Sequence, residues 1–190
     1  MNKPLAFILS LAAMLLTVGC GSSESEYSTV RCYLVLDNAN HLDATLASAM
    51  NASAPGVFCK VSTTFSGGVN YYTFANNQGQ QSQSIFDAED SRRSLVIGLN
   101  NAVIVGYGSL SQPATFNAFD AECPNCFDPD ALPVKTKPLQ MTTSGMAVCN
   151  SCHRQYSLNN GGVISSGDGG HKLTRYRATS TGPYGVLSVQ

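Results

Sequence analysis

Hydrophobic and polar positions alternate over short stretches through most of the chain, which is the pattern of β-strands. These stretches are rich in Val, Tyr, Phe and Thr, and Gly, Asn and Ser separate them. The predicted strands are Val30–Leu36, Val57–Thr63, Val69–Phe74, Ser94–Leu99, Ala102–Tyr107, Ala114–Phe119, Met146–Val148, Leu173–Arg177 and Val186–Val189. We therefore expect an all-β fold of small antiparallel sheets.

Three other stretches depart from this alternation. Asp43–Met50 has the spacing of a short helix, with Asp43 as its N-terminal cap. Asn100 and Asn101 lie between two apolar runs and predict a tight hairpin, because Asn tolerates left-handed backbone. Gln78–Arg93 is acidic and polar, and it predicts a long surface loop.

The first 19 residues have the pattern of a secretory signal peptide. A short basic start precedes the apolar run Leu5–Val18, which is too short to span a bilayer. The run ends just before Cys20, and the sequence there resembles the lipobox of bacterial lipoproteins, although Thr17 stands where Leu is usual. Cys20 is the predicted lipidation site. The alternative is an ordinary signal peptide that ends near a Cys.

This interpretation divides the chain into a signal peptide over residues 1–19, a flexible lipid tether over 20–27 and one β domain over 28–190. The tether is small, polar and acidic. The resemblance to lipoproteins implies that the protein is attached to a membrane of the bacterial cell envelope, on its periplasmic or surface face. Because Gly21 supplies no acidic retention signal, we expect the outer membrane.

The charge balance narrows the range of partners. Lys and Arg total 11 against 12 Asp and Glu, and charged residues make up only 12% of the chain. Because this number of cationic side chains is too small to neutralise a row of phosphates, nucleic acid is not an expected partner. A protein or glycan partner stays undefined. Nucleophile elbows, phosphate-binding Gly loops and H-E-x-x-H motifs are absent from the sequence, so we expect no catalytic residue.

Six cysteines remain after Cys20, and four of them form two C-x2-C pairs: Cys123 with Cys126, and Cys149 with Cys152. Two such turns can bring four thiolates to one tetrahedral metal centre, with a spacing just beyond that of zinc ribbons. The alternative is disulfides, which an exported chain could form by pairing cysteines of different turns.

Cys32 and Cys59 lie on two predicted strands on either side of the short helix. An oxidising compartment favours a disulfide between them, which would stabilise the fold by roughly 3 kcal/mol. The alternative is a pair of buried thiols that act as small hydrophobic side chains.

The segment from Cys149 onward resembles the second half of a Rieske domain. Tyr156 lies four residues beyond the box that ends at Cys152, Gly161-Gly162 match a turn, and Leu173 and Tyr176 match a strand. Upstream, residues 119–124 resemble the run into the first Rieske box. The resemblance implies a small antiparallel sandwich or barrel in which two loops meet at one metal centre.

The metal ligands differ from those of the family. Asn125 stands where the first ligand His belongs, Cys126 follows it, and Cys152 replaces the second His. Four Cys suit Zn²⁺ or a low-potential [2Fe–2S] cluster. The signal peptide has no Arg pair, so the chain is expected to cross the membrane unfolded, after which zinc is easier to acquire than a cluster. We therefore predict structural zinc, with [2Fe–2S] electron transfer or a disulfide-stapled interaction domain as alternatives.

Overall fold

The computed structural model describes residues 25–190. The predicted signal peptide and Cys20 lie outside these residues. Within the described range, none of the helices has the length and apolar character needed to cross a membrane. The fold is mostly β, as the alternating pattern predicts, and all the strand pairings are antiparallel.

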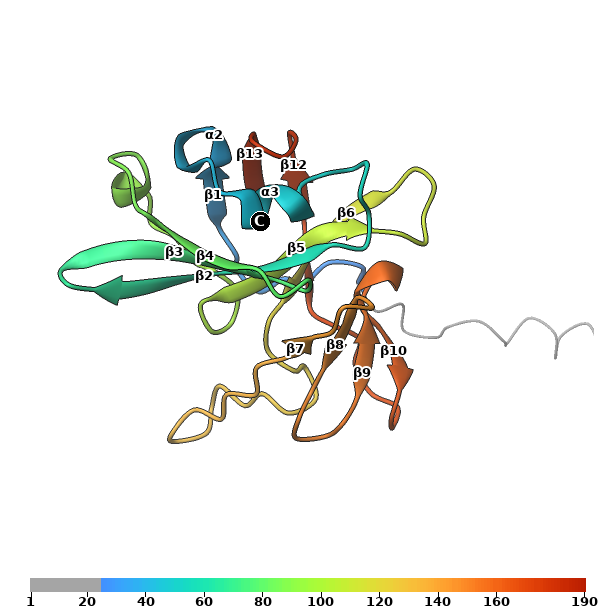
Figure 1. The fold of residues 1–190 in the computed structure, drawn as a ribbon. Helices are drawn as coiled ribbons and strands as arrows, with labels where there is room; N and C mark the ends of the chain where they lie inside the picture. The colour runs from blue at the N-terminus through green and yellow to red at the C-terminus, as the bar shows by residue number, and fades with distance from the viewer. Residues whose placement is uncertain (1–24) are drawn as a thin grey trace, which may run out of the picture.

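The strands of residues 25–190 form three sheets (Figure 1). The central six-stranded sheet has the order β11 (Arg175–Tyr176), β6 (Thr115–Asp120), β5 (Ala102–Gly108), β2 (Phe58–Ser66), β3 (Val69–Asn76) and β4 (Gln81–Ile85). A four-stranded sheet has the order β10 (Val163–Ser166), β9 (Gln155–Ser157), β8 (Met146–Val148) and β7 (Gln140–Met141). A three-stranded sheet has the order β1 (Leu34–Asp37), β13 (Val186–Val189) and β12 (Ala178–Ser180).

Strands β2, β5 and β6 of the six-stranded sheet carry buried apolar side chains on both faces, so the sheet separates two cores. Successive side chains of a strand point to opposite faces, and on β2 Phe58 therefore belongs to one core and Cys59 to the other. The first core, which contains Cys59 and Leu46, lies toward β1, β13 and the helix α3 (Ala44–Ala49). The second core, which contains Phe58 and Tyr156, lies toward the four-stranded sheet.

Helix α3 forms where the sequence predicts it. The side chain of Asp43 accepts a hydrogen bond from the backbone N–H of Leu46 at 2.8 Å, which caps the first turn. Leu46 is fully buried against the sheet. A second helix, α2 (Asn38–His41), is not predicted, because a single turn of four residues is too short to show helical periodicity.

Two predicted elements are wrong. Gln78–Arg93 is not a continuous loop, because it contains strand β4 and a 3-10 helix over Asp90–Arg92. The β4 sequence is polar on both faces, so hydrophobic alternation cannot reveal it. Ser94–Leu99 is not a strand and makes only an isolated bridge through Val96. Asn101 does adopt left-handed backbone, but in a turn that joins no hairpin.

Two aromatic side chains of β3, Tyr72 and Phe74, are part of the first core. Tyr72 and Phe74 are almost completely buried, and the Tyr72 ring packs against Phe86 with 4.3 Å between ring centroids. These side chains are therefore unable to form an exposed binding face.

The N-terminal end of the described chain is attached to the domain. Glu26 forms an ion pair with Arg175 at 2.7 Å, and the Tyr27 ring packs against Arg175 and Arg177. Glu26 and Tyr27, which the prediction places in the flexible tether, are therefore held against the domain.

Candidate metal centre

The structure brings the four cysteines of the two C-x2-C pairs together. Their sulfur atoms all lie within 4.8 Å of one another, and those of Cys123 and Cys152 are 3.8 Å apart. Cys123 and Cys149 are buried, whereas Cys126 and Cys152 are partly exposed. The centre therefore lies at the edge of the second core, with one cysteine of each pair turned toward solvent.

The first cysteine turn follows strand β6. The Cys123 carbonyl accepts hydrogen bonds from the backbone N–H groups of Cys126 at 3.1 Å and Phe127 at 2.9 Å. The Cys123 N–H donates to the Lys137 carbonyl at 2.9 Å, which ties the turn to the segment leading into β7. These bonds fold the backbone back on itself, so both sulfur atoms of the pair can reach one point.

The second cysteine turn connects β8 to β9. The Cys149 carbonyl accepts a hydrogen bond from the His153 N–H at 2.9 Å, and the Cys149 N–H donates to the Arg154 carbonyl at 3.1 Å. His153 adopts left-handed backbone, with a φ of 58°, and this closes the turn. The first and second turns thus present their cysteines in similar ways.

Tyr156 links the two turns. Its hydroxyl lies 3.3 Å from the sulfur of Cys123, and it accepts a hydrogen bond from Asn125 Nδ2 at 2.9 Å. Because Asn125 supplies that donor, the phenolic hydrogen is free to point at the sulfur. Such a bond to a metal-bound thiolate would orient it and reduce its charge.

Arg154 changes the ionisation of Cys152. Burial opposes formation of the Cys152 thiolate, but the backbone N–H and the guanidinium of Arg154, together with the thiols of Cys126 and Cys149, outweigh it and lower the pKa of Cys152 to about 6. Burial, followed by the neighbouring thiols of Cys152 and Cys123, raises the pKa of Cys126 to about 12. One cysteine of the group is thus prepared to lose its proton first.

The Gly-rich segment Gly167–His171 lies beside the centre, and two side chains from the cysteine turns hold it there. Arg154 donates to the carbonyls of Asp168 at 3.0 Å and Gly169 at 2.9 Å. Asn125 donates to the His171 carbonyl at 2.8 Å and accepts from the His171 N–H at 2.9 Å. Reasoning from the sequence identified neither role. The only signal was that Asn125 stands where the Rieske resemblance would place a ligand His.

This arrangement suits a closed metal site. Four thiolates complete a tetrahedron around Zn²⁺ and leave no position for water or substrate. Sulfur atoms at the corners of such a tetrahedron, with bonds of about 2.3 Å, are about 3.8 Å apart. The observed Cys123–Cys152 separation of 3.8 Å equals that value.

Cys32 and Cys59 lie apart from this group. Both are buried free thiols in the first core, in place of the predicted disulfide. The Cys59 thiol donates to the Lys60 carbonyl at 3.5 Å, and the Cys32 thiol lies near the Gly98 backbone. Burial is the main cause that raises the pKa of each thiol, so both are held as neutral hydrophobic groups.

His41, Asp87 and Asp90 form a second group of metal-ligating types. Here most of the polar atoms already have hydrogen-bond partners in the protein. Asp90 Oδ1 accepts from the Tyr72 hydroxyl at 3.1 Å, and Asp90 Oδ2 lies 3.0 Å from His41 Nε2. Arg93 also pairs with Asp90 at 3.4 Å. We interpret this group as a buried ion-pair network that holds α2 against β3.

No protein-family model, curated protein or solved structure matches the chain. The Rieske resemblance therefore stays a prediction from the sequence.

Proposed function

We propose that the protein is a non-catalytic lipoprotein of the bacterial cell envelope whose Rieske-like domain holds one structural Zn²⁺ through Cys123, Cys126, Cys149 and Cys152. The observation that carries this proposal is the convergence of all four sulfur atoms within 4.8 Å of one another. The signal-like N-terminus and Cys20 support export and lipid attachment.

The sulfur spacing favours a single ion over a cluster. A [2Fe–2S] cluster divides its four cysteines between two irons, so sulfur atoms on different irons are separated by the length of the cluster. Here all four sulfur atoms lie within 4.8 Å of one another. Loss of both His ligands also removes the groups that raise the potential of a Rieske centre and carry its protons.

The ion would add a link between two parts of the fold that already share one hydrophobic core. One cysteine pair follows a strand of the six-stranded sheet, and the other lies within the four-stranded sheet. Binding of zinc by all four cysteines would fasten the small sheet to the large one. Such a role is structural, because a saturated thiolate site lacks an open coordination position.

Metal analysis of the purified protein tests this proposal. The mature chain is produced by export and, separately, in the cytoplasm, and its metals, free thiols and visible spectrum are measured. We expect about one zinc per chain and a colourless protein. Cys149→Ser is expected to lose the zinc, whereas Cys59→Ala is expected to retain it.

Three results would contradict the proposal. Two irons per chain with visible bands would replace it with an electron-transfer function. One iron per chain would show that the same four thiolates select a different ion. A metal-free exported protein without free thiols would make the four cysteines disulfide staples.

A further inference from the structure

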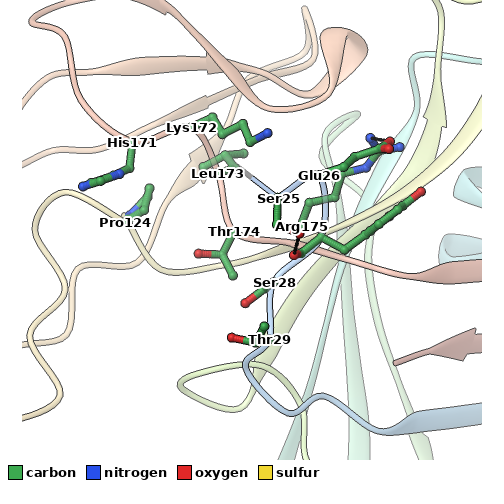
Figure 2. Close-up of a pocket in the computed structure, with 11 residues that line it drawn as sticks. Ser25, Glu26, Ser28, Thr29, Pro124, His171, Lys172, Leu173, Thr174 and Arg175 are labelled. Carbon is green, nitrogen blue, oxygen red and sulfur yellow. Dashed lines mark hydrogen bonds and ion pairs between the residues drawn. The ribbon is translucent and has the colours of Figure 1, made fainter. Parts of the chain in front are cut away.

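Residues Ser25–Thr29, here called the N-terminal arm, lie along one side of the domain (Figure 2). Arg175 fixes the arm at two points. Its Nη1 atom donates to Glu26 Oε1 at 2.7 Å, and its backbone carbonyl accepts from the N–H of Ser28 at 2.8 Å. One interaction involves side chains and the other the backbone, so the direction of the chain is fixed as well as its position.

Tyr27 strengthens this attachment. The guanidinium carbon of Arg177 lies 4.9 Å from the centroid of the Tyr27 ring, and that of Arg175 lies 5.2 Å from it. Contacts of this kind attract a cation to the face of an aromatic ring. The chain is therefore bound to the domain from Glu26 onward.

This attachment limits how far the domain can move from a lipid on Cys20, and the limit rests on the proposed lipidation of that residue. Six residue steps separate Cys20 from Glu26, and a fully extended chain of that length spans about 20 Å. The point at which the arm meets the domain must therefore stay within about 20 Å of the bilayer surface.

The arm carries one acidic residue, Glu26, which pairs with Arg175, and two further basic side chains lie beside the arm. Lys172 lines the hollow beside the arm, and Arg177, which is exposed, lies against Tyr27. Basic groups near an anionic bilayer surface are attracted to lipid phosphates.

An exposed apolar side chain lies on the same side. Leu110, in the loop between β5 and β6, is 70% exposed. It borders a surface hollow together with Glu26 and Arg175, so the loop is next to the arm. In Figure 1 the β5–β6 loop and β10 project on the same side of the molecule, whereas the segment between β6 and β7 projects on the other.

The four-cysteine centre borders this surface. A hollow of about 380 Å³ separates the arm from Pro124 and His171, which lie together at its far end in Figure 2. Pro124 directly follows Cys123, and His171 is bonded to Asn125. The cysteine turns therefore lie at the edge of the surface that carries the arm.

We propose that this surface, formed by the N-terminal arm, Lys172, Arg177 and Leu110, rests on the lipid bilayer that holds the acylated Cys20. The basic side chains lie at the lipid phosphates, and Leu110 lies at the boundary between headgroups and acyl chains. The centre is then held beside the membrane in one orientation.

Fluorescence quenching by brominated lipids tests this orientation, because the chain contains no Trp and one introduced Trp is a unique probe. The acylated full chain carries either Leu110→Trp or Leu132→Trp and is reconstituted into vesicles of phosphatidylethanolamine and phosphatidylglycerol. Leu132 is 97% exposed in the segment between β6 and β7. We expect the Leu110→Trp protein to lose most of its emission and the Leu132→Trp protein to keep it.

Two further variants test the cause. Tyr27→Ala, combined with Leu110→Trp, should loosen the arm and reduce the quenching, while the protein stays bound to the vesicles through its lipid. Arg177→Glu with Leu110→Trp should weaken the quenching.

The outcomes separate this proposal from the one on which it rests. If Cys20→Ser and the unchanged chain both fail to associate with vesicles, and no acyl group is found by mass spectrometry, the proposed lipoprotein itself is wrong. If the chain is acylated and bound but Leu110→Trp is not quenched, or Leu132→Trp is quenched as strongly, the proposed orientation is overturned. If a second copy or another protein covers Leu110→Trp, this residue is also unquenched, and the proposed orientation is overturned in that case too.

Discussion

Asn125 binds both backbone polar atoms of His171, donating to its carbonyl at 2.8 Å and accepting from its N–H at 2.9 Å. The Asn125 side chain thus holds the segment that ends at His171 against the first cysteine turn. It also donates to the Tyr156 hydroxyl, whose oxygen lies beside the sulfur of Cys123.

Asn125→Ala should loosen the centre without removing a ligand. It deletes three hydrogen bonds, and we expect a loss of about 1–3 kcal/mol in stability and faster zinc transfer to a chelator. Stopped-flow transfer to a chromogenic chelator measures the rate. Asn150→Ala is the matched control, because Asn150 follows Cys149 in the other turn and is exposed. Equal rates for the two variants would show that the Asn125 bonds do not hold the centre.

Arg154 should control the reactivity of Cys152 in the metal-free protein. With a pKa of about 6, Cys152 is mostly thiolate at pH 7, and its alkylation should slow as the pH falls through about 6. Arg154→Ala removes the guanidinium and should raise this pKa, so alkylation at pH 7 slows by about tenfold. Iodoacetamide labelling followed by peptide mass spectrometry measures the rate at each cysteine. An unchanged pH profile in the variant would contradict the role of Arg154.

The Gly161-Gly162 turn should be sensitive at its second position. A Cβ on Gly162 would lie 2.8 Å from Leu173 Cβ and 2.9 Å from the Phe119 ring, whereas the space around Gly161 is open. Both residues have positive φ, so each Ala carries the left-handed penalty of about 1–2 kcal/mol. Gly162→Ala adds steric overlap in the second core. Urea unfolding should therefore show a larger loss for Gly162→Ala, and similar losses would mean that the core yields without cost.

Removal of the metal should affect the two cores differently. Cys123 and Cys149 belong to the core under the four-stranded sheet, and none of the four ligands belongs to the core around Leu46. With a chelator, we expect amide hydrogen exchange to rise in β7, β8 and β9 while β2 and β3 stay protected. Uniform exchange across the described part of the chain would indicate that the ion supports the whole fold, and unchanged exchange would remove its structural role.

The sequence identifies the elements whose cause is local. The Asp43 cap and the spacing of the C-x2-C pairs each depend on residues a few positions apart, and both predictions agree with the structure. Strand β4 escapes prediction because its Gln and Ser residues carry no hydrophobic signal. This segment forms a strand because it pairs with β3, and that pairing is not visible in the hydrophobic pattern of the segment itself.

The surroundings of the centre could not be predicted for a similar reason. Asn125 and His171 are 46 residues apart, and nothing in their identity indicates that they meet. For Cys32 and Cys59, by contrast, the sequence predicts a bond, whereas the structure has two free thiols. Their positions on neighbouring elements suggested a disulfide, but the first core receives them as separate hydrophobic groups.

X-ray absorption at the metal edge tests the central claim, because it identifies the element and its ligands in one measurement. For the protein purified from the cell envelope, we expect a zinc edge and a single shell of four sulfur atoms at about 2.3 Å, without a neighbouring metal. Scattering from a second metal, or a shell that contains nitrogen or oxygen in place of sulfur, would contradict a single zinc ion held by Cys123, Cys126, Cys149 and Cys152.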